Sequence, residues 1–277
     1  MNCLVIGAGT MGAGIAEVLA RAGHPTQLQD LNDDLLASAR QRIHQSLERA
    51  HSKQKITAEQ AQRGRDNLVD HNRPDLVVEA VLEDIQVKIG ILQPLSHQHP
   101  EAILASNTSS LSLTQMAAAC HRPERVIGMH FFNPPPIMEL LEIVVAEQTD
   151  THTQQAVEQL ARQLGKTPIL VKDVPGFASS RLGIILGMEA IRMLESGVAS
   201  AADIDKAMEL GYRHPMGPLK LTDLVGLDVR LAIADHLTHE IGPQFTPPPL
   251  LRRLVRAGRL GKKTGHGFYR WNGNEAS

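Results

Sequence analysis

Short apolar runs alternate with longer segments of helical spacing through the first part of the chain. Apolar residues recur with a helical period over residues 13–21 and 33–50, two segments rich in Ala, Leu, Arg and Gln. Strands that alternate with helices are typical of βαβ units and of a parallel sheet with helices on both faces. The expected strands cover residues 3–6, 26–29, 76–78, 103–105, 126–132, 140–145 and 169–171.

The pattern changes near residues 175–176, beyond which helices dominate. Residues 181–195 are apolar almost all round, which is typical of a helix buried on most sides by a core and by a second subunit. An α/β domain is therefore expected over residues 1–174 and an all-α domain over residues 175–277. Further elements expected in the second domain are a helix capped by Ser200 and ended by Gly211, a helix over residues 223–240, and a possible short strand near residues 268–269.

The composition argues against nucleic-acid and membrane partners. The 277 residues include 28 Lys and Arg against 30 Asp and Glu, and 3% are aromatic, whereas nucleic-acid binding favours a basic excess and stacking rings. Glycines, Thr10 and Glu17 interrupt the apolar N-terminal residues and no basic segment precedes them, so neither a membrane span nor a signal peptide is expected. Two cysteines cannot build a disulfide framework, which favours the reducing cytoplasm.

A glycine-rich turn follows the first apolar run directly. Gly7, Gly9 and Gly12 match G-x-G-x-x-G and precede a helical pattern. These glycines permit a tight turn, close approach of a pyrophosphate, and close packing of helix on strand. Asp30, at the end of the second expected strand, is placed to accept hydrogen bonds from a ribose and to repel a 2′-phosphate. The pattern predicts a Rossmann-type domain that binds NAD rather than NADP; the alternative is a structural glycine turn beside a surface carboxylate.

Two ionisable residues interrupt apolar runs on either side of a proline-rich connection. His130 and Glu142 each lie six residues from Pro136, so a fold-back about that proline would place them opposite each other, within hydrogen-bonding reach. Such a pair suits removal of a proton from an alcohol, with the carboxylate orienting the imidazole. The alternative is a satisfied core histidine and an edge-strand glutamate. The residues alone indicate an NAD-linked, two-domain dehydrogenase and do not identify its alcohol.

The chain resembles the L-3-hydroxyacyl-CoA dehydrogenases of the short, single-function type, whose bacterial members are often called 3-hydroxybutyryl-CoA dehydrogenases. The resemblance covers essentially the whole length and implies reversible NAD-dependent oxidation of the 3-hydroxyl of an acyl-CoA. Fatty-acid metabolism is one of several routes that use this chemistry. Its landmarks occur in order: VIGAGTMGAGIA at 5–16, VVEAVLE at 77–83, ASNTSSL at 105–111, GMHFFNPPP at 128–136, KDVPGF at 172–177, HPMGPL at 214–219 and GKKTGHGFY at 261–269.

The resemblance also implies roles for individual residues. His130 is then the general base, Glu142 its orienting partner, and Ser109 a hydrogen-bonding partner of the substrate's 3-oxygen. Ser46 and Lys53 would contact CoA, and Lys53 forms a local basic cluster with Arg49 and Lys55, for which a solvated helix face is the alternative. Cofactor contacts are implied for Thr10, Met11, Glu83, Lys88, Asn107 and Asn133.

The second domain is expected to close over the cofactor and to form a homodimer, with residues 175–176 as the hinge. The chain departs from the family at one position near this hinge, because it has Ser180 where many relatives have Asn. A serine hydroxyl is shorter than a carboxamide, so the details of substrate placement are expected to differ there. His97 and His99 resemble half of a metal site, but nothing nearby completes it, so no metal is expected.

Two other functions remain open. One is an NAD-linked dehydrogenase of a free β-hydroxyacid, whose members typically use a catalytic Lys in the helical domain. The other is a non-catalytic NADH-binding protein, against which the set of Ser109, His130 and Glu142 argues. Acetoacetyl-CoA and acetoacetate discriminate these functions as substrates.

Overall fold

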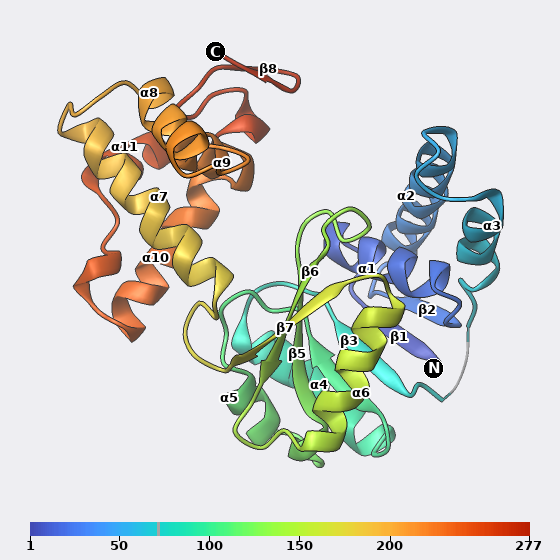
Figure 1. The fold of residues 1–277 in the computed structure, drawn as a ribbon. Helices are drawn as coiled ribbons and strands as arrows, with labels where there is room; N and C mark the ends of the chain where they lie inside the picture. Colours follow the sequence, from blue (N-terminus) through green and yellow to red (C-terminus); the bar gives the residue numbers. More distant parts are fainter. Residues whose placement is uncertain (71–72) are drawn as a thin grey trace. The chain divides into compact units, whose positions relative to one another are not determined.

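The computed structural model describes residues 1–70 and 73–277 of the chain, which form two compact units (Figure 1). The first unit covers Met1–Val174 and the second Pro175–Ser277. Each unit has its own apolar core.

A seven-stranded, mostly parallel sheet forms the centre of the first unit. Its order is β2-β1-β3-β4-β5-β6-β7. The first five strands run parallel, β6 is antiparallel to β5, and β7 is parallel to β6. The predicted strands are all present, with ends shifted by up to two residues. Their bounds are β1 Cys3–Ile6, β2 Thr26–Gln29, β3 Leu76–Glu79, β4 Ile103–Ser106, β5 Val126–Phe131, β6 Leu140–Val145 and β7 Thr167–Lys172.

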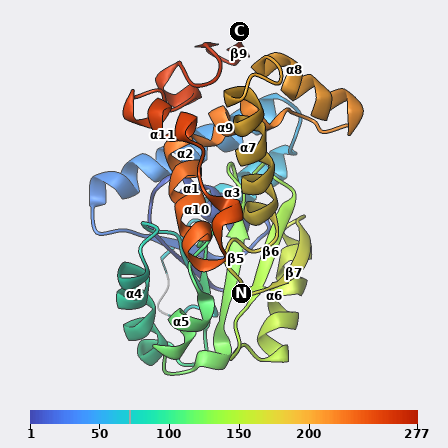
Figure 2. The ribbon, with the colours of Figure 1, turned by 90° about the vertical axis from the view of Figure 1, so that its left-hand side faces the viewer.

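Helices flank this sheet, with α4 and α5 on one side and α6 on the other (Figure 2). Most of these helices begin at a side chain that accepts hydrogen bonds from first-turn N–H groups, as Asn32 does for α2 and Asp84 for α4. The predicted mostly parallel α/β fold is thereby confirmed. The helices are α1 Thr10–Arg21, α2 Asp33–Ser52, α3 Ala58–Asp66, α4 Ile85–Gln98, α5 Leu113–Ala118 and α6 Thr151–Gln163, with a 3-10 turn η1 at Pro123–Arg125.

The strand order brings the predicted functional residues of the first unit together at the carboxyl ends of the parallel strands, which form one edge of the sheet. The order reverses direction at β1, which lies between β2 and β3. In open α/β sheets, ligands bind outside the carboxyl ends of the strands at such a switch point. Gly7 follows β1, Ala80 follows β3 and Asn107 follows β4 at this edge, and His130 is the last residue but one of β5.

The second unit is helical, as predicted. Ser200 caps α8 as expected, and the following π-helix η2 extends to Gly211. The single helix expected over residues 223–240 is wrong: Gly226, with φ 106°, separates α9 from α10. The short strand lies at 271–272 rather than 268–269. The elements are α7 Ser179–Glu195, α8 Ala201–Lys206, η2 Ala207–Gly211, α9 Pro218–Val225, α10 Leu227–Glu240, η3 Pro243–Phe245, α11 Pro249–Arg256, η4 Lys262–Thr264, β8 Trp271–Asn272 and β9 Glu275–Ala276.

Helix α7 buries only one face within the chain. Ile184, Met188 and Ile191 are in the core, whereas Leu182 is 63% and Leu186 42% exposed. The core covers only one face of α7 and the remaining apolar residues face outward, so their burial by a second subunit stays a prediction. In the described part of the chain, no helix is both long enough and apolar enough to span a membrane.

Candidate active site

The glycine-rich turn has the close packing that the sequence predicts. A Cβ on Gly12 would lie 1.7 Å from the Gly7 carbonyl oxygen, so only glycine fits at position 12. Gly7 has φ 104°, which a side chain would strain. A Cβ on Gly9, in contrast, would meet no atom within 4 Å. The backbone is thus packed tightly against β1 and open at Gly9, where α1 begins with unsatisfied N–H groups.

Asp30 is fixed beside this turn. Its Oδ2 accepts a 2.6 Å hydrogen bond from the Ala8 N–H, and its Oδ1 accepts one of 2.7 Å from the Leu31 N–H. Arg42 on α2 donates to the Ala8 carbonyl oxygen over 2.6 Å, a contact that the sequence did not suggest. These hydrogen bonds join the turn to the Asp30 carboxylate on one side and to Arg42 on the other.

His130 and Glu142 face each other across β5 and β6, in the register that the proline-centred fold-back predicts. His130 Nδ1 lies 2.6 Å from Glu142 Oε2. The histidine is 7% exposed and the glutamate 0%, so the pair is almost completely withdrawn from water. An ionised carboxylate accepts hydrogen bonds only, so opposite such a group Nδ1 is the donor and Nε2 the acceptor of the imidazole.

Asn107 connects the pair to the neighbouring strand. Its Oδ1 accepts a 2.9 Å hydrogen bond from the N–H of Phe131, next to His130. The aromatic ring of Phe132 lies 4.7 Å from the imidazole, measured between ring centroids. Asn133, predicted to contact the cofactor, is exposed in the connection that follows.

Ser109 lies beside Glu83 at the same sheet edge. Oε1 of Glu83 accepts hydrogen bonds from Thr108 Oγ1 at 2.7 Å, from the Ser109 N–H at 2.7 Å and from Ser109 Oγ at 3.0 Å. Burial opposes ionisation of Glu83, but the Lys88 ammonium and these donors outweigh it and hold the pKa of the carboxyl below its usual range. The predicted residues Glu83, Lys88 and Ser109 thus form one cluster.

Lys88 is buried and pairs with two carboxylates. Only 1% of it is exposed, and its Nζ lies 2.8 Å and 3.0 Å from the two carboxylate oxygens of Glu79 and 3.4 Å from Glu83 Oε2. Glu79 also accepts from Ser106 Oγ at 2.6 Å and from the Val81 N–H at 2.6 Å. Sequence reasoning missed Glu79, although a carboxylate inside an apolar strand is the same signal that indicated Glu142.

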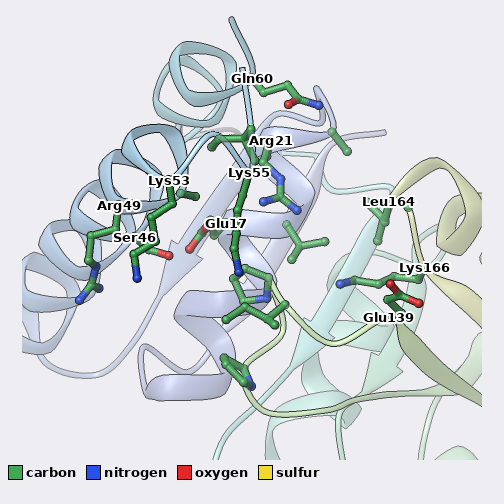
Figure 3. A pocket seen from close by; sticks show the side chains of 18 of the residues that line it. Glu17, Arg21, Ser46, Arg49, Lys53, Lys55, Gln60, Glu139, Leu164 and Lys166 are labelled. Atoms are coloured by element: carbon green, nitrogen blue, oxygen red, sulfur yellow. The ribbon is translucent and has the colours of Figure 1, made fainter. Parts of the chain in front are cut away.

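The predicted CoA-contacting residues line a pocket of about 780 Å³ in the first unit. Ser46, Arg49 and Lys53 lie on α2 and at its end, and Figure 3 shows them across the pocket from Glu139 and Lys166. The other charged residues of the lining are Glu17, Arg21 and Lys55, so the lining has a basic excess.

Two residues of this pocket are buried and were not predicted. Lys166 donates hydrogen bonds to the carbonyl oxygens of Pro135 and Met138, over 2.6 Å and 2.7 Å. Burial, followed by the nearby Arg21 charge, lowers the pKa of Lys166. Burial raises the pKa of Glu17, against the opposing effects of the Ser46 hydroxyl and the neighbouring cations.

Two further expectations concern positions outside this cluster. Ser180 is the second residue of α7, in the second unit, and is half-buried. His97 stacks on His121, with ring centroids 4.8 Å apart. Among the residues that the structure describes, no group of His, Cys, Asp and Glu could hold a metal ion.

A Rossmann turn at the switch point, with a buried imidazole–carboxylate pair at the same sheet edge, is the arrangement of a nicotinamide-dependent dehydrogenase. The chain belongs to the 3-hydroxyacyl-CoA dehydrogenase family, which confirms the resemblance seen in its sequence. Residues 2–174 match the family model described as "3-hydroxyacyl-CoA dehydrogenase, NAD binding domain", and residues 176–271 match the C-terminal domain of the same family.

Curated relatives match the chain over nearly its full length. The chain is 45% identical over 275 residues to the 3-hydroxybutyryl-CoA dehydrogenase of Mycobacterium tuberculosis, covering 96% of each protein. It is 44% identical over 274 residues to a probable 3-hydroxybutyryl-CoA dehydrogenase of Deinococcus radiodurans, covering 96% of this chain and 99% of the relative. The crystal structure of (S)-3-hydroxybutyryl-CoA dehydrogenase PaaH1 from Ralstonia eutropha superposes with a TM-score of 0.93 at 39% identity, covering 98% and 99% of the two chains.

Proposed function

We propose that this protein catalyses the reversible, NAD-dependent oxidation of an L-3-hydroxyacyl-CoA, 3-hydroxybutyryl-CoA or a similar thioester, to the 3-ketoacyl-CoA. The observation that carries this proposal is the buried 2.6 Å contact between His130 Nδ1 and Glu142 Oε2 at the sheet edge of the glycine-rich turn. The names of the full-length relatives support the choice of substrate class.

In this proposal the His–Glu pair moves the proton. Nε2 of His130 takes the proton of the substrate's 3-hydroxyl, and the buried Glu142 carboxylate stabilises the resulting imidazolium. NAD, when bound, accepts the hydride that leaves carbon 3. In the reverse direction His130 returns the proton to the oxygen.

Ser109 would bind the same substrate oxygen. A serine hydroxyl carries one proton and two lone pairs, so it can stabilise a developing alkoxide by donating to it. Glu83, with its neighbours Thr108 and Lys88, positions this serine at the sheet edge.

The glycine-rich turn would hold the cofactor. Gly7 and Gly12 shape the turn, the open backbone at Gly9 receives the pyrophosphate, and Thr10 and Met11 contribute N–H groups from the start of α1. Asp30 would bind the adenosine ribose hydroxyls. Further contacts are proposed for Glu83, Lys88, Asn107 and Asn133.

The basic pocket would hold the CoA portion of the substrate. Ser46 and Lys53 line it, together with Arg49 and Lys55, and these cations match the several phosphate charges of CoA. Anchoring the thioester here raises the effective concentration of the reacting carbon.

We further propose that the second unit contributes to substrate binding through Ser180 and closes the site against water. Two copies would pair through the exposed apolar residues of α7, including Leu182 and Leu186. We place the protein in the cytoplasm, where thiols such as those of the buried Cys3 and Cys120 stay reduced. Fatty-acid metabolism is the pathway that we propose for it.

Oxidation of NADH with acetoacetyl-CoA or with acetoacetate tests this function. Consumption of NADH with the thioester alone is the expected result. Turnover of acetoacetate at a comparable rate would favour a free β-hydroxyacid dehydrogenase. NADH binding with neither substrate consumed would favour a non-catalytic NADH-binding protein.

A further inference from the structure

Arg42 is an exposed cation that is fixed beside the glycine-rich turn. Its Nη2 donates to the Ala8 carbonyl oxygen over 2.6 Å, and its Nη1 donates over 2.9 Å to Ser38 Oγ, one helical turn earlier on α2. The side chain is otherwise exposed to solvent. An exposed arginine ordinarily samples many rotamers, so these two hydrogen bonds give the guanidinium a defined place at the turn.

The charge of Arg42 has no partner of opposite sign. Over residues 1–70 and 73–277 its guanidinium makes these two hydrogen bonds and no ion pair. Arg40, two residues earlier on α2, instead lies 3.4 Å from the Asp70 carboxylate. The acceptors that Arg42 already has are neutral, and a guanidinium carries five N–H groups. Most of its donors and its whole charge are therefore available to an anionic ligand.

Arg42 and Asp30 contact the same residue of the turn. Asp30 Oδ2 accepts a 2.6 Å hydrogen bond from the Ala8 N–H, while Arg42 donates to the carbonyl oxygen of Ala8. The N–H and the carbonyl group of one residue are only a few ångströms apart. The carboxylate and the guanidinium thus lie within the span of a ribose and one phosphate group.

The two side chains have opposite preferences for the adenosine ribose of a dinucleotide. In Rossmann-type domains an acidic residue binds the 2′-hydroxyl of NAD, whereas a nearby arginine accommodates the 2′-phosphate of NADP. This turn has both groups. Ser38 adds a further donor, because its hydroxyl accepts from Arg42 and keeps its own proton for a phosphate oxygen.

We propose that Arg42 is a second determinant of cofactor selectivity, which binds the 2′-phosphate of NADP in opposition to Asp30. This inference rests on the proposed function, which places the adenosine ribose at Asp30. The guanidinium would form charge-assisted hydrogen bonds with the phosphate, and NAD has no 2′-phosphate to gain from them. The selectivity for NAD is then the difference between repulsion by Asp30 and attraction by Arg42.

Fluorescence titration with NADH and with NADPH tests this proposal without any acyl-CoA. The measured quantity is the ratio of the Kd for NADPH to the Kd for NADH. Arg42→Ala is expected to raise this ratio about 10–100-fold, the range for hydrogen bonds to a charged group. The same substitution in the Asp30→Ala background, where NADPH should bind more tightly, is expected to raise the ratio as well. An unchanged or lower ratio in both backgrounds would overturn the proposal.

Two further variants locate the effect. Arg42→Lys keeps the charge without the planar fork and should give an intermediate ratio. Arg40→Ala removes an arginine of the same helix that pairs with Asp70, and this matched control should leave the ratio unchanged. Because the Arg42 side chain is exposed, Arg42→Ala should keep a thermal midpoint close to that of the wild type.

The remaining outcomes separate this proposal from the proposed function. Equal weakening of NADH and NADPH binding in Arg42→Ala would show that Arg42 only shapes the turn, and would overturn the 2′-phosphate assignment while leaving the dehydrogenase function intact. Failure of the wild type to bind either cofactor would overturn the cofactor site, and with it both proposals.

Discussion

The Ser109 hydroxyl lies 3.0 Å from Glu83 Oε1, so its only proton is directed at that carboxylate. While it donates to Glu83, the hydroxyl can only accept a hydrogen bond from a ligand. To stabilise an oxyanion it must turn its proton away. The Glu83 carboxylate would then lose one hydrogen bond but keep those from Thr108 Oγ1 and from the Ser109 N–H.

The lowered pKa of Glu83 predicts a specific pH dependence. A carboxyl group whose pKa is lower in the folded protein stabilises the fold above its ordinary value of 4.5, and that contribution is lost as the pH falls through the lowered pKa. The difference in thermal midpoint between the wild type and Glu83→Gln should therefore be constant near neutral pH and shrink on acidification. A difference that grows with acidification would contradict this assignment.

The buried Glu79–Lys88 pair predicts a large loss of stability when one partner is neutralised. Glu79→Gln leaves the Lys88 ammonium buried, with only the more distant Glu83 carboxylate near it. Breaking such a pair typically costs about 3–5 kcal/mol, which urea unfolding would measure. Glu59→Gln removes an exposed partner of Arg63 and is the control, expected to leave the midpoint unchanged. Equal losses in the two variants would show that burial of the pair is unimportant.

Substitutions at two glycines of the turn should affect NADH affinity and thermal stability separately. Gly9→Ala introduces a methyl group into open space, so the thermal midpoint should be retained while NADH binding weakens by about tenfold or more. Gly12→Ala forces a methyl group against the Gly7 carbonyl oxygen and should lower the midpoint itself. Fluorescence titration with NADH, beside thermal melts, measures both effects. Unchanged NADH affinity in Gly9→Ala would place the pyrophosphate elsewhere.

Asp30 is expected to determine the selectivity for NAD over NADP. Asp30→Ala removes the acceptor for the ribose hydroxyls and the repulsion of a 2′-phosphate, while Arg42 stays beside the turn. The KM for NAD should rise by about tenfold, and NADP should become a usable cofactor. Asp34→Ala, at an exposed aspartate of α2, is the control. Cofactor selectivity that survives in Asp30→Ala would assign selection to another residue.

Much of the first unit could be predicted because its signals are local. The apolar runs indicated all seven strands, and the prolines between β5 and β6 fixed the register that joins His130 to Glu142. The Glu79–Lys88 pair was missed because it joins a strand to the next helix, a contact that no local period encodes. The break at Gly226 was missed because one glycine does not interrupt an apolar helical pattern.

The rate of acetoacetyl-CoA reduction by His130→Ala, measured alongside its affinity for NADH, tests the proposed catalytic pair most directly. His152→Ala, at an exposed histidine of α6, is the matched control. Loss of the general base should lower kcat by about 10²–10⁴-fold or more while NADH binds with nearly unchanged affinity. Turnover by His130→Ala at a rate close to that of the wild type would contradict the mechanism.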